Sequence, residues 1–165
     1  MTYLTTLFTG RSAGRLLLFV FVLFVPTIVV GQTNRNRGAA PEDQPVFHEY
    51  RGVQIGWLAD EVRKKLGDPA DKGEEQDFYI FGEKETAQIL YDKATKKVVA
   101  ISVDFSNGAT GILTPQQVFG SDVEAKPDGS KYKLIRYPKA GYWLSYSRTA
   151  GETPIITITI QKMNQ

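Results

Sequence analysis

Residues 99–105 read Val-Ala-Ile-Ser-Val-Asp-Phe, and residues 156–160 read Ile-Thr-Ile-Thr-Ile. In both stretches apolar and polar side chains alternate with a period of two, which is typical of a β-strand that buries one face. Gly56-Trp57-Leu58 precedes the first stretch, and Gly111-Ile112-Leu113 precedes the second at the same spacing. The chain beyond its N-terminal region is therefore interpreted as one arrangement written twice.

The repeat predicts the fold class. Its constant spacing makes Ile89 correspond to Leu144, and Ile101 to Ile156. We expect an α+β fold of two tandem helix–β-β-β units, which form an antiparallel sheet of about six strands with short helices packed on one face. The two units span residues 46–108 and 109–165.

Local signals place the elements of each unit. Apolar residues at helical spacing predict a first helix from Leu58 to Leu66, and Thr114-Pro115-Gln116-Gln117 is a typical start for a second, with Thr114 as its cap. Aromatic, β-branched and alternating runs predict the strands. These runs cover residues 78–81, 87–91, 99–105, 132–137, 141–146 and 155–160.

Residues 1–31 have the composition of a secretory signal peptide, because Arg11 and Arg15 precede an apolar stretch that ends in small and aliphatic residues. That stretch, residues 16–30, is shorter than the roughly 17–25 residues that cross a bilayer. We expect export to the periplasm or the extracellular space, with an uncleaved membrane anchor at residues 16–30 as the alternative. Residues 32–45 are polar and rich in Gly and Pro, which predicts a flexible linker.

Charge and cysteine content exclude several classes of protein. The chain has 20 Lys and Arg against 18 Asp and Glu, and the loss of residues 1–31 would remove two Arg and no acid. The mature chain would then be neutral, so it lacks the positive field of a nucleic-acid-binding protein. It has no cysteine, so neither a disulfide nor a lipid attached through cysteine is available.

The first unit also resembles a known family. The motif consists of Val53, Ile55-Gly56, Val62 and Leu66-Gly67-x-Pro69, followed by an aromatic strand and a hairpin. This motif is similar to that of the SmpA/OmlA family of small outer-membrane assembly lipoproteins. The duplicated form of that α+β fold resembles the β-lactamase-inhibitor protein fold. The resemblance implies a protein-binding scaffold in the cell envelope. The chain departs from the family in lacking the anchoring cysteine, and in having Leu58 where a Ser or Thr usually caps the first helix.

No catalytic, cofactor-binding or metal-ligating set stands out. His48 is the only histidine and lies beside the linker without a recognisable partner. Ser130-Lys131-Tyr132-Lys133 matches a Ser-x-x-Lys string, but it enters a predicted strand, where positions three apart point to opposite faces. The acidic residues of segment 71–77 do not have the spacing of a calcium loop, and we interpret them as solvated.

The aromatic residues of the second unit are the strongest candidates for binding. If Tyr142, Leu144 and Tyr146 face the core, strand parity places Trp143 on the opposite face of the sheet. Trp, Tyr and Arg dominate binding hot spots. The predicted partner-binding residues are Trp143, Arg136, Tyr132 and Tyr137.

These observations favour an exported, non-enzymatic protein-binding module of the cell envelope, whose partner is another envelope or secreted protein. Two alternatives stay open. One is an inhibitor of a secreted hydrolase that inserts a loop such as residues 71–76 into a cleft, and the other is a membrane-anchored domain of unknown activity. No cofactor is expected, and contact with a membrane is expected only through an uncleaved N-terminal segment.

Overall fold

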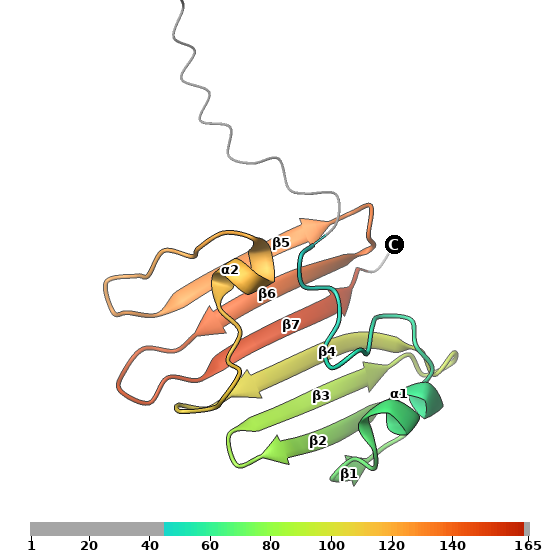
Figure 1. The fold of residues 1–165 in the computed structure, drawn as a ribbon. Coiled ribbons are helices and arrows are strands. Elements are labelled where there is room, and N and C mark those ends of the chain that lie inside the picture. The colour runs from blue at the N-terminus through green and yellow to red at the C-terminus, as the bar shows by residue number, and fades with distance from the viewer. Residues whose placement is uncertain (1–44, 164–165) are drawn as a thin grey trace, which may run out of the picture. The chain divides into compact units, whose positions relative to one another are not determined.

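A computed structural model describes residues 45–163 (Figure 1). The chain divides into two compact units, residues 1–36 and 37–165, and the described residues all belong to the second. The predicted signal and nearly all of the predicted linker lie outside the described residues. No helix within residues 45–163 is long and apolar enough to cross a membrane.

The described part contains two short helices and seven strands. The helices are α1 (Ala59–Leu66) and α2 (Pro115–Phe119). The strands are β1 (Asp71–Lys72), β2 (Gln76–Gly82), β3 (Glu85–Tyr91), β4 (Val98–Phe105), β5 (Lys131–Tyr137), β6 (Tyr142–Arg148) and β7 (Ile156–Lys162).

All seven strands join one antiparallel sheet in the order β1-β2-β3-β4-β7-β6-β5. The predicted α+β class with about six strands was therefore wrong. The helices have only eight and five residues, so the fold is mainly β. The prediction overlooked β1, a strand of two residues that is too short to show any alternation.

The core lies between the sheet and the helices, which Figure 1 shows on the same side of the sheet. Val62 of α1 and Val118 of α2 are fully buried against strand residues that point to this side. The sheet contributes every second residue of its inner strands, including Ile89, Ile101, Leu144, Ile158 and Ile160. We call this the helix face of the sheet, and the opposite side the outer face.

The two helices begin with different caps. The hydroxyl of Thr114 accepts a hydrogen bond from the Gln117 backbone N–H at 3.3 Å, and the Gln117 side chain accepts one from the Thr114 backbone N–H at 2.8 Å. This is a reciprocal capping box. At the start of α1, Leu58 has no side chain that can accept a bond, and only the return half is present, from the Leu58 N–H to Glu61 at 2.8 Å.

Strand pairing changes the internal correspondence that the sequence suggested. Ile89 pairs with Ile101, whereas Leu144 pairs with Ile160 rather than with Ile156. The constant spacing therefore fails to reproduce the pairing, because Leu144 and Ile156, which correspond to Ile89 and Ile101, do not pair with each other. The partner of Leu144 lies four residues further along β7, and an even displacement keeps every side chain on its own face, so the apolar pattern alone cannot reveal it.

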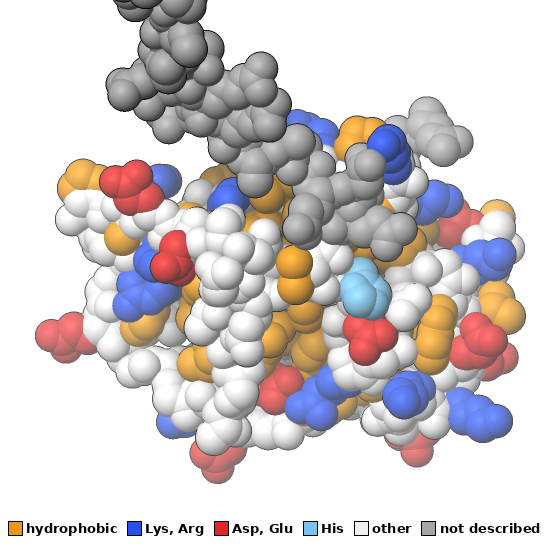
Figure 2. Space-filling model, turned by 45° about the horizontal axis from the view of Figure 1, so that its top comes forward, with side chains coloured by type: hydrophobic (Ala, Val, Ile, Leu, Met, Phe, Trp, Pro, Cys, Tyr) orange, Lys and Arg blue, Asp and Glu red, His pale blue; other side chains and the backbone are white. Residues whose placement is uncertain are grey.

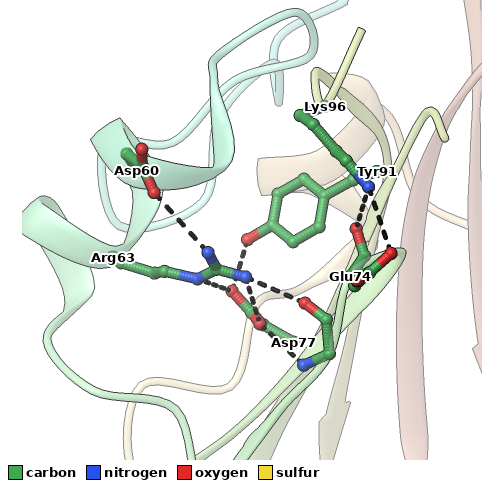
Figure 3. A network of polar contacts seen from close by, with 7 residues as sticks. Asp60, Arg63, Glu74, Asp77, Tyr91 and Lys96 are labelled. Carbon is green, nitrogen blue, oxygen red and sulfur yellow. Dashed lines mark hydrogen bonds and ion pairs between the residues drawn. The ribbon is translucent and has the colours of Figure 1, made fainter. Parts of the chain in front are cut away.

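A buried ion pair fixes α1 to the sheet (Figure 3). Asp77 of β2 is 0% exposed and accepts bonds from Arg63 Nε at 2.8 Å, Arg63 Nη2 at 3.0 Å and the Tyr91 hydroxyl at 2.7 Å. Hydrogen bonding to this carboxylate raises the pKa of Arg63. Burial raises the pKa of Tyr91, and its bond to Asp77 adds to the effect.

A contact between a lysine and an aromatic ring holds α2 against the second half of the sheet. Lys133 Nζ of β5 lies 5.1 Å from the centre of the Phe119 ring at the end of α2, and it donates to the Ser121 hydroxyl at 3.0 Å. A cation–π contact at a partly exposed site is worth about 0.5–1 kcal/mol. The first helix is therefore held by a buried charge pair, and the second by a weaker contact that needs no buried carboxylate.

Candidate functional site

No helix or strand of residues 45–163 lies over the outer face of the sheet, because both helices lie on the other side (Figure 1). Cross-strand pairing arranges its side chains in three rows that run across the sheet. The first row is Gln76, Leu90, Ala100, Gln161, Trp143 and Arg136. The second is Asp71, Phe78, Gln88, Ser102, Thr159, Ser145 and Leu134. The third is Ile80, Thr86, Asp104, Thr157, Ser147 and Tyr132.

The composition of the outer face differs from that of the whole chain. Within residues 45–163, the charged residues at the strand positions of this face are Asp71, which pairs with Phe78, Asp104 and Arg136, whereas 23% of the whole chain is charged. Apolar and aromatic residues gather at its two sides, and Ile80 and Tyr132 are 60% and 57% exposed. Depletion of charge together with exposed aromatic and apolar side chains is the composition of interface cores.

The middle of the outer face is made of short polar side chains that bond to one another. The Thr157 hydroxyl donates to Asp104 Oδ1 at 2.6 Å, and the hydroxyls of Ser102 and Thr159 lie 3.1 Å apart. Because Asp104 already has a donor across the strand pair, covering this region would cost less than covering a free carboxylate. The centre is therefore flat, polar and nearly neutral.

Three of the four predicted partner-binding residues share this face. Trp143 pairs directly with Arg136 across β5 and β6, and Tyr132 lies near the other end of β5, opposite Ser147. Tyr137 does not belong to the site, because it points to the helix face and is 4% exposed. Strand parity could have shown this, since adjacent residues such as Arg136 and Tyr137 point to opposite faces of a strand.

Segment 71–77 was predicted to be a solvated loop, and Asp71, Glu74 and Glu75 are exposed, but the segment is not a loop throughout. Asp71–Lys72 forms β1, and the turn after it is closed by a bond from the Gly73 N–H to the Gln76 carbonyl at 2.8 Å. Arg63 Nη2 also donates to the Gly73 carbonyl at 2.9 Å. Asp77, predicted to be solvated, is fully buried. The segment is thus a tight hairpin that is held against α1.

A pocket of ≈ 520 Å³ opens beside this hairpin, between the start of α1 and Lys96. Among its cationic groups, Arg63 pairs with Asp77 and Asp60, and Lys96 Nζ lies 3.8 Å from Glu74 (Figure 3). Lys72 also lines the pocket and forms no ion pair within residues 45–163. Two of the three cationic groups of the pocket are therefore matched within the protein.

The residues considered for catalysis lie apart from one another. His48 is exposed, as Figure 2 shows, and its Nδ1 lies 3.2 Å from the Val46 carbonyl oxygen. Ser130 bonds to Asp128, whereas Lys133 bonds to Ser121, so the Ser-x-x-Lys string does not bring its two side chains together. Within residues 45–163, no three His, Asp or Glu side chains are grouped so that they could hold a metal ion.

Comparison with known proteins finds no counterpart: no family model, no curated protein and no solved structure matches this chain. The resemblance to the SmpA/OmlA family therefore stays a prediction.

Proposed function

We propose that the chain is an exported, non-enzymatic module of the cell envelope that binds another protein through the outer face of its sheet. The observation that carries the proposal is the composition of this face. This face carries few charged side chains and has Trp143 and Arg136 side by side, whereas 23% of the whole chain is charged. The leader-like residues 1–31 support export.

The size of the outer face fits this role. Strands of seven residues extend about 20 Å, and six strands with a spacing of about 4.8 Å cover roughly 500–700 Å² of flat area. A standard protein–protein interface buries about 800 Å² on each partner. The face and its rim therefore provide most of the area that one stable partner would need.

Affinity purification from an envelope extract tests the proposal with three forms of the full-length protein. Trp143→Ala removes the tryptophan of the outer face, which is half-buried. Leu58→Ala is the control, because Leu58 is an exposed apolar residue that lies at the start of α1. We expect one protein to be retained by the wild type and by Leu58→Ala, and to be reduced at least about tenfold by Trp143→Ala.

Two results would contradict the proposal. Equal recovery of the partner with all three forms would show that the outer face is not used. Loss with Leu58→Ala and retention with Trp143→Ala would assign binding to the helix face. Circular dichroism of each variant checks that the loss does not come from unfolding.

A further inference from the structure

The two edges of the sheet differ in how completely their backbone groups are paired. At one edge, β1 pairs with β2, and Asp71 lies opposite Phe78. The Gly73 N–H bonds to the Gln76 carbonyl in the turn between these two strands. The register of β2 also shifts between Ile80 and Gly82. A short capping strand and a bulge are ordinary protections of a sheet edge. The opposite edge is β5, which pairs regularly with β6 over seven residues and has no further strand beside it within residues 45–163.

The hydrogen bonds of β6 show which residues of β5 face the free edge. Met163 N–H bonds to the Gly141 carbonyl at 2.9 Å, and Thr149 N–H bonds to the Ile155 carbonyl at 3.0 Å, so odd-numbered residues of β6 face β7. In an antiparallel ladder the direction of these groups alternates along the strand. The even-numbered residues of β6 therefore face β5.

The partners of those even-numbered residues are the odd-numbered residues of β5, as in the pair Ile135 and Leu144. The N–H and C=O groups of Tyr132, Leu134 and Arg136 consequently point away from the sheet. None of the hydrogen bonds within residues 45–163 outside the strand ladders ends on these backbone groups. The edge thus presents three donors and three acceptors in the spacing that an added strand requires.

The charge of β5 selects the kind of strand that fits. Residues 131–137 contain Lys131, Lys133 and Arg136 and no acid. None of these three cations takes part in an ion pair within the described residues, and Lys133 has only uncharged partners, the Phe119 ring and the Ser121 hydroxyl. A second copy of β5 would bring three more cations beside them without an acid between, which is unfavourable. Acidic side chains on an added strand would lie beside Lys131 and Lys133 on the helix face and beside Arg136 on the outer face.

We propose that the β5 edge is a second binding site, which accepts an extended acidic segment of a partner protein as an added antiparallel strand. Backbone hydrogen bonds to Tyr132, Leu134 and Arg136 supply the pairing, and the cations of β5 select acidic sequences. This site shares Tyr132, Leu134 and Arg136 with the outer face, but it differs from it in depending on the backbone of β5 and not on Trp143.

The probe is an acetylated and amidated peptide of about seven residues that alternates Glu with Val, the length of β5. Amide hydrogen exchange of the full-length protein is followed by NMR with and without about 1 mM peptide. We expect protection of the Tyr132, Leu134 and Arg136 amides to rise at least about tenfold, whereas the Lys133 and Ile135 amides are already protected in the free protein.

Two matched reagents separate strand addition from simple charge attraction. The same peptide with alternate amides N-methylated keeps its charge but cannot pair, and we expect it to lose at least about tenfold in affinity. The variant Leu134→Pro removes one edge N–H without breaking the ladder to β6, and it should weaken binding similarly. Ile80→Pro, at the other edge, should leave the affinity unchanged.

Three results would overturn the proposal: unchanged protection at the three amides with about 1 mM peptide, equal affinity of the N-methylated peptide, or equal affinity of a peptide with Lys in place of Glu. The first two do not depend on the folding of any variant. Trp143→Ala should leave this peptide's affinity unchanged, so failure here and failure of the outer-face proposal are distinguishable.

Discussion

Replacement of Asp77 by Ala should destabilise the protein more than any other single change of a charged residue in the described part. Asp77 accepts hydrogen bonds from two nitrogens of Arg63, from the Tyr91 hydroxyl and, at 3.3 Å, from the Gly73 N–H. Without the carboxylate, the guanidinium of Arg63, whose side chain is only 19% exposed, loses its main partner, and the Tyr91 hydroxyl is left buried and unbonded.

The magnitude follows from the cost of an unpaired buried charge. Removal of one member of a buried ion pair typically costs about 3–5 kcal/mol. Asp60→Ala is the matched control, because Asp60 also contacts Arg63, at 3.5 Å, but its side chain is 96% exposed. An exposed pair contributes at most about 1 kcal/mol, so the control should lose no more than that.

Urea denaturation at pH 7 measures both variants against the wild type, with the midpoint and the slope reported separately. The double variant Arg63→Met with Asp77→Leu removes both charges, and we expect it to recover much of the stability that Asp77→Ala loses. A loss below about 1 kcal/mol for Asp77→Ala, or equal losses for Asp77→Ala and Asp60→Ala, would refute the claim that this ion pair fixes α1 to the sheet.

Three further predictions concern single groups. The Tyr79 hydroxyl is buried without a hydrogen-bond partner. Tyr79→Phe should therefore leave the free energy of unfolding unchanged or raise it by up to about 1 kcal/mol in urea titrations. A decrease of the free energy of unfolding by more than about 1 kcal/mol would contradict this prediction. Burial raises the pKa of Tyr79 to about 12 from 10.0, and the pKa of Tyr91 is raised as well. The unfolded chain therefore releases these protons first, so the contribution of the two tyrosines to stability should be fully present below pH 10 and fall as the pH rises toward 12. The fall should be shallower in Tyr79→Phe, and an unchanged slope would count against the prediction. Thr114→Ala removes the cap of α2 and should lower the free energy of unfolding by about 1 kcal/mol, which is measured as a decrease of the thermal midpoint. Thr110→Ala, in the preceding loop, should leave the thermal midpoint unchanged.

Local sequence patterns predicted the positions of the longer strands. The run 78–81 lies within β2, and residues 99–105 lie within β4, because alternation and aromatic content depend only on neighbours in the chain. The prediction for Trp143 also rested on alternation, and it places the side chain on the face opposite Leu144, as the pairing does.

Features that depend on distant contacts could not be predicted in the same way. Asp77 looks like one acid in a charged segment, and its burial follows only once Arg63 and Tyr91, each 14 residues away, meet it across the sheet and α1. The pairing of Leu144 with Ile160 could not be predicted for another reason. A strand pattern with a period of two is unchanged by a shift of any even number of residues, so it predicts the face of each side chain but leaves the register open.

The central claim, that the outer face binds a partner protein, is tested most directly by photo-crosslinking in cells that produce the protein. A photoreactive residue replaces Thr159 at the centre of the outer face in one variant, and Lys65 on the exposed side of α1 in another. We predict a crosslinked protein of one defined mass from position 159 and none from position 65. The same adduct from both positions, or an adduct from position 65 alone, would contradict the account.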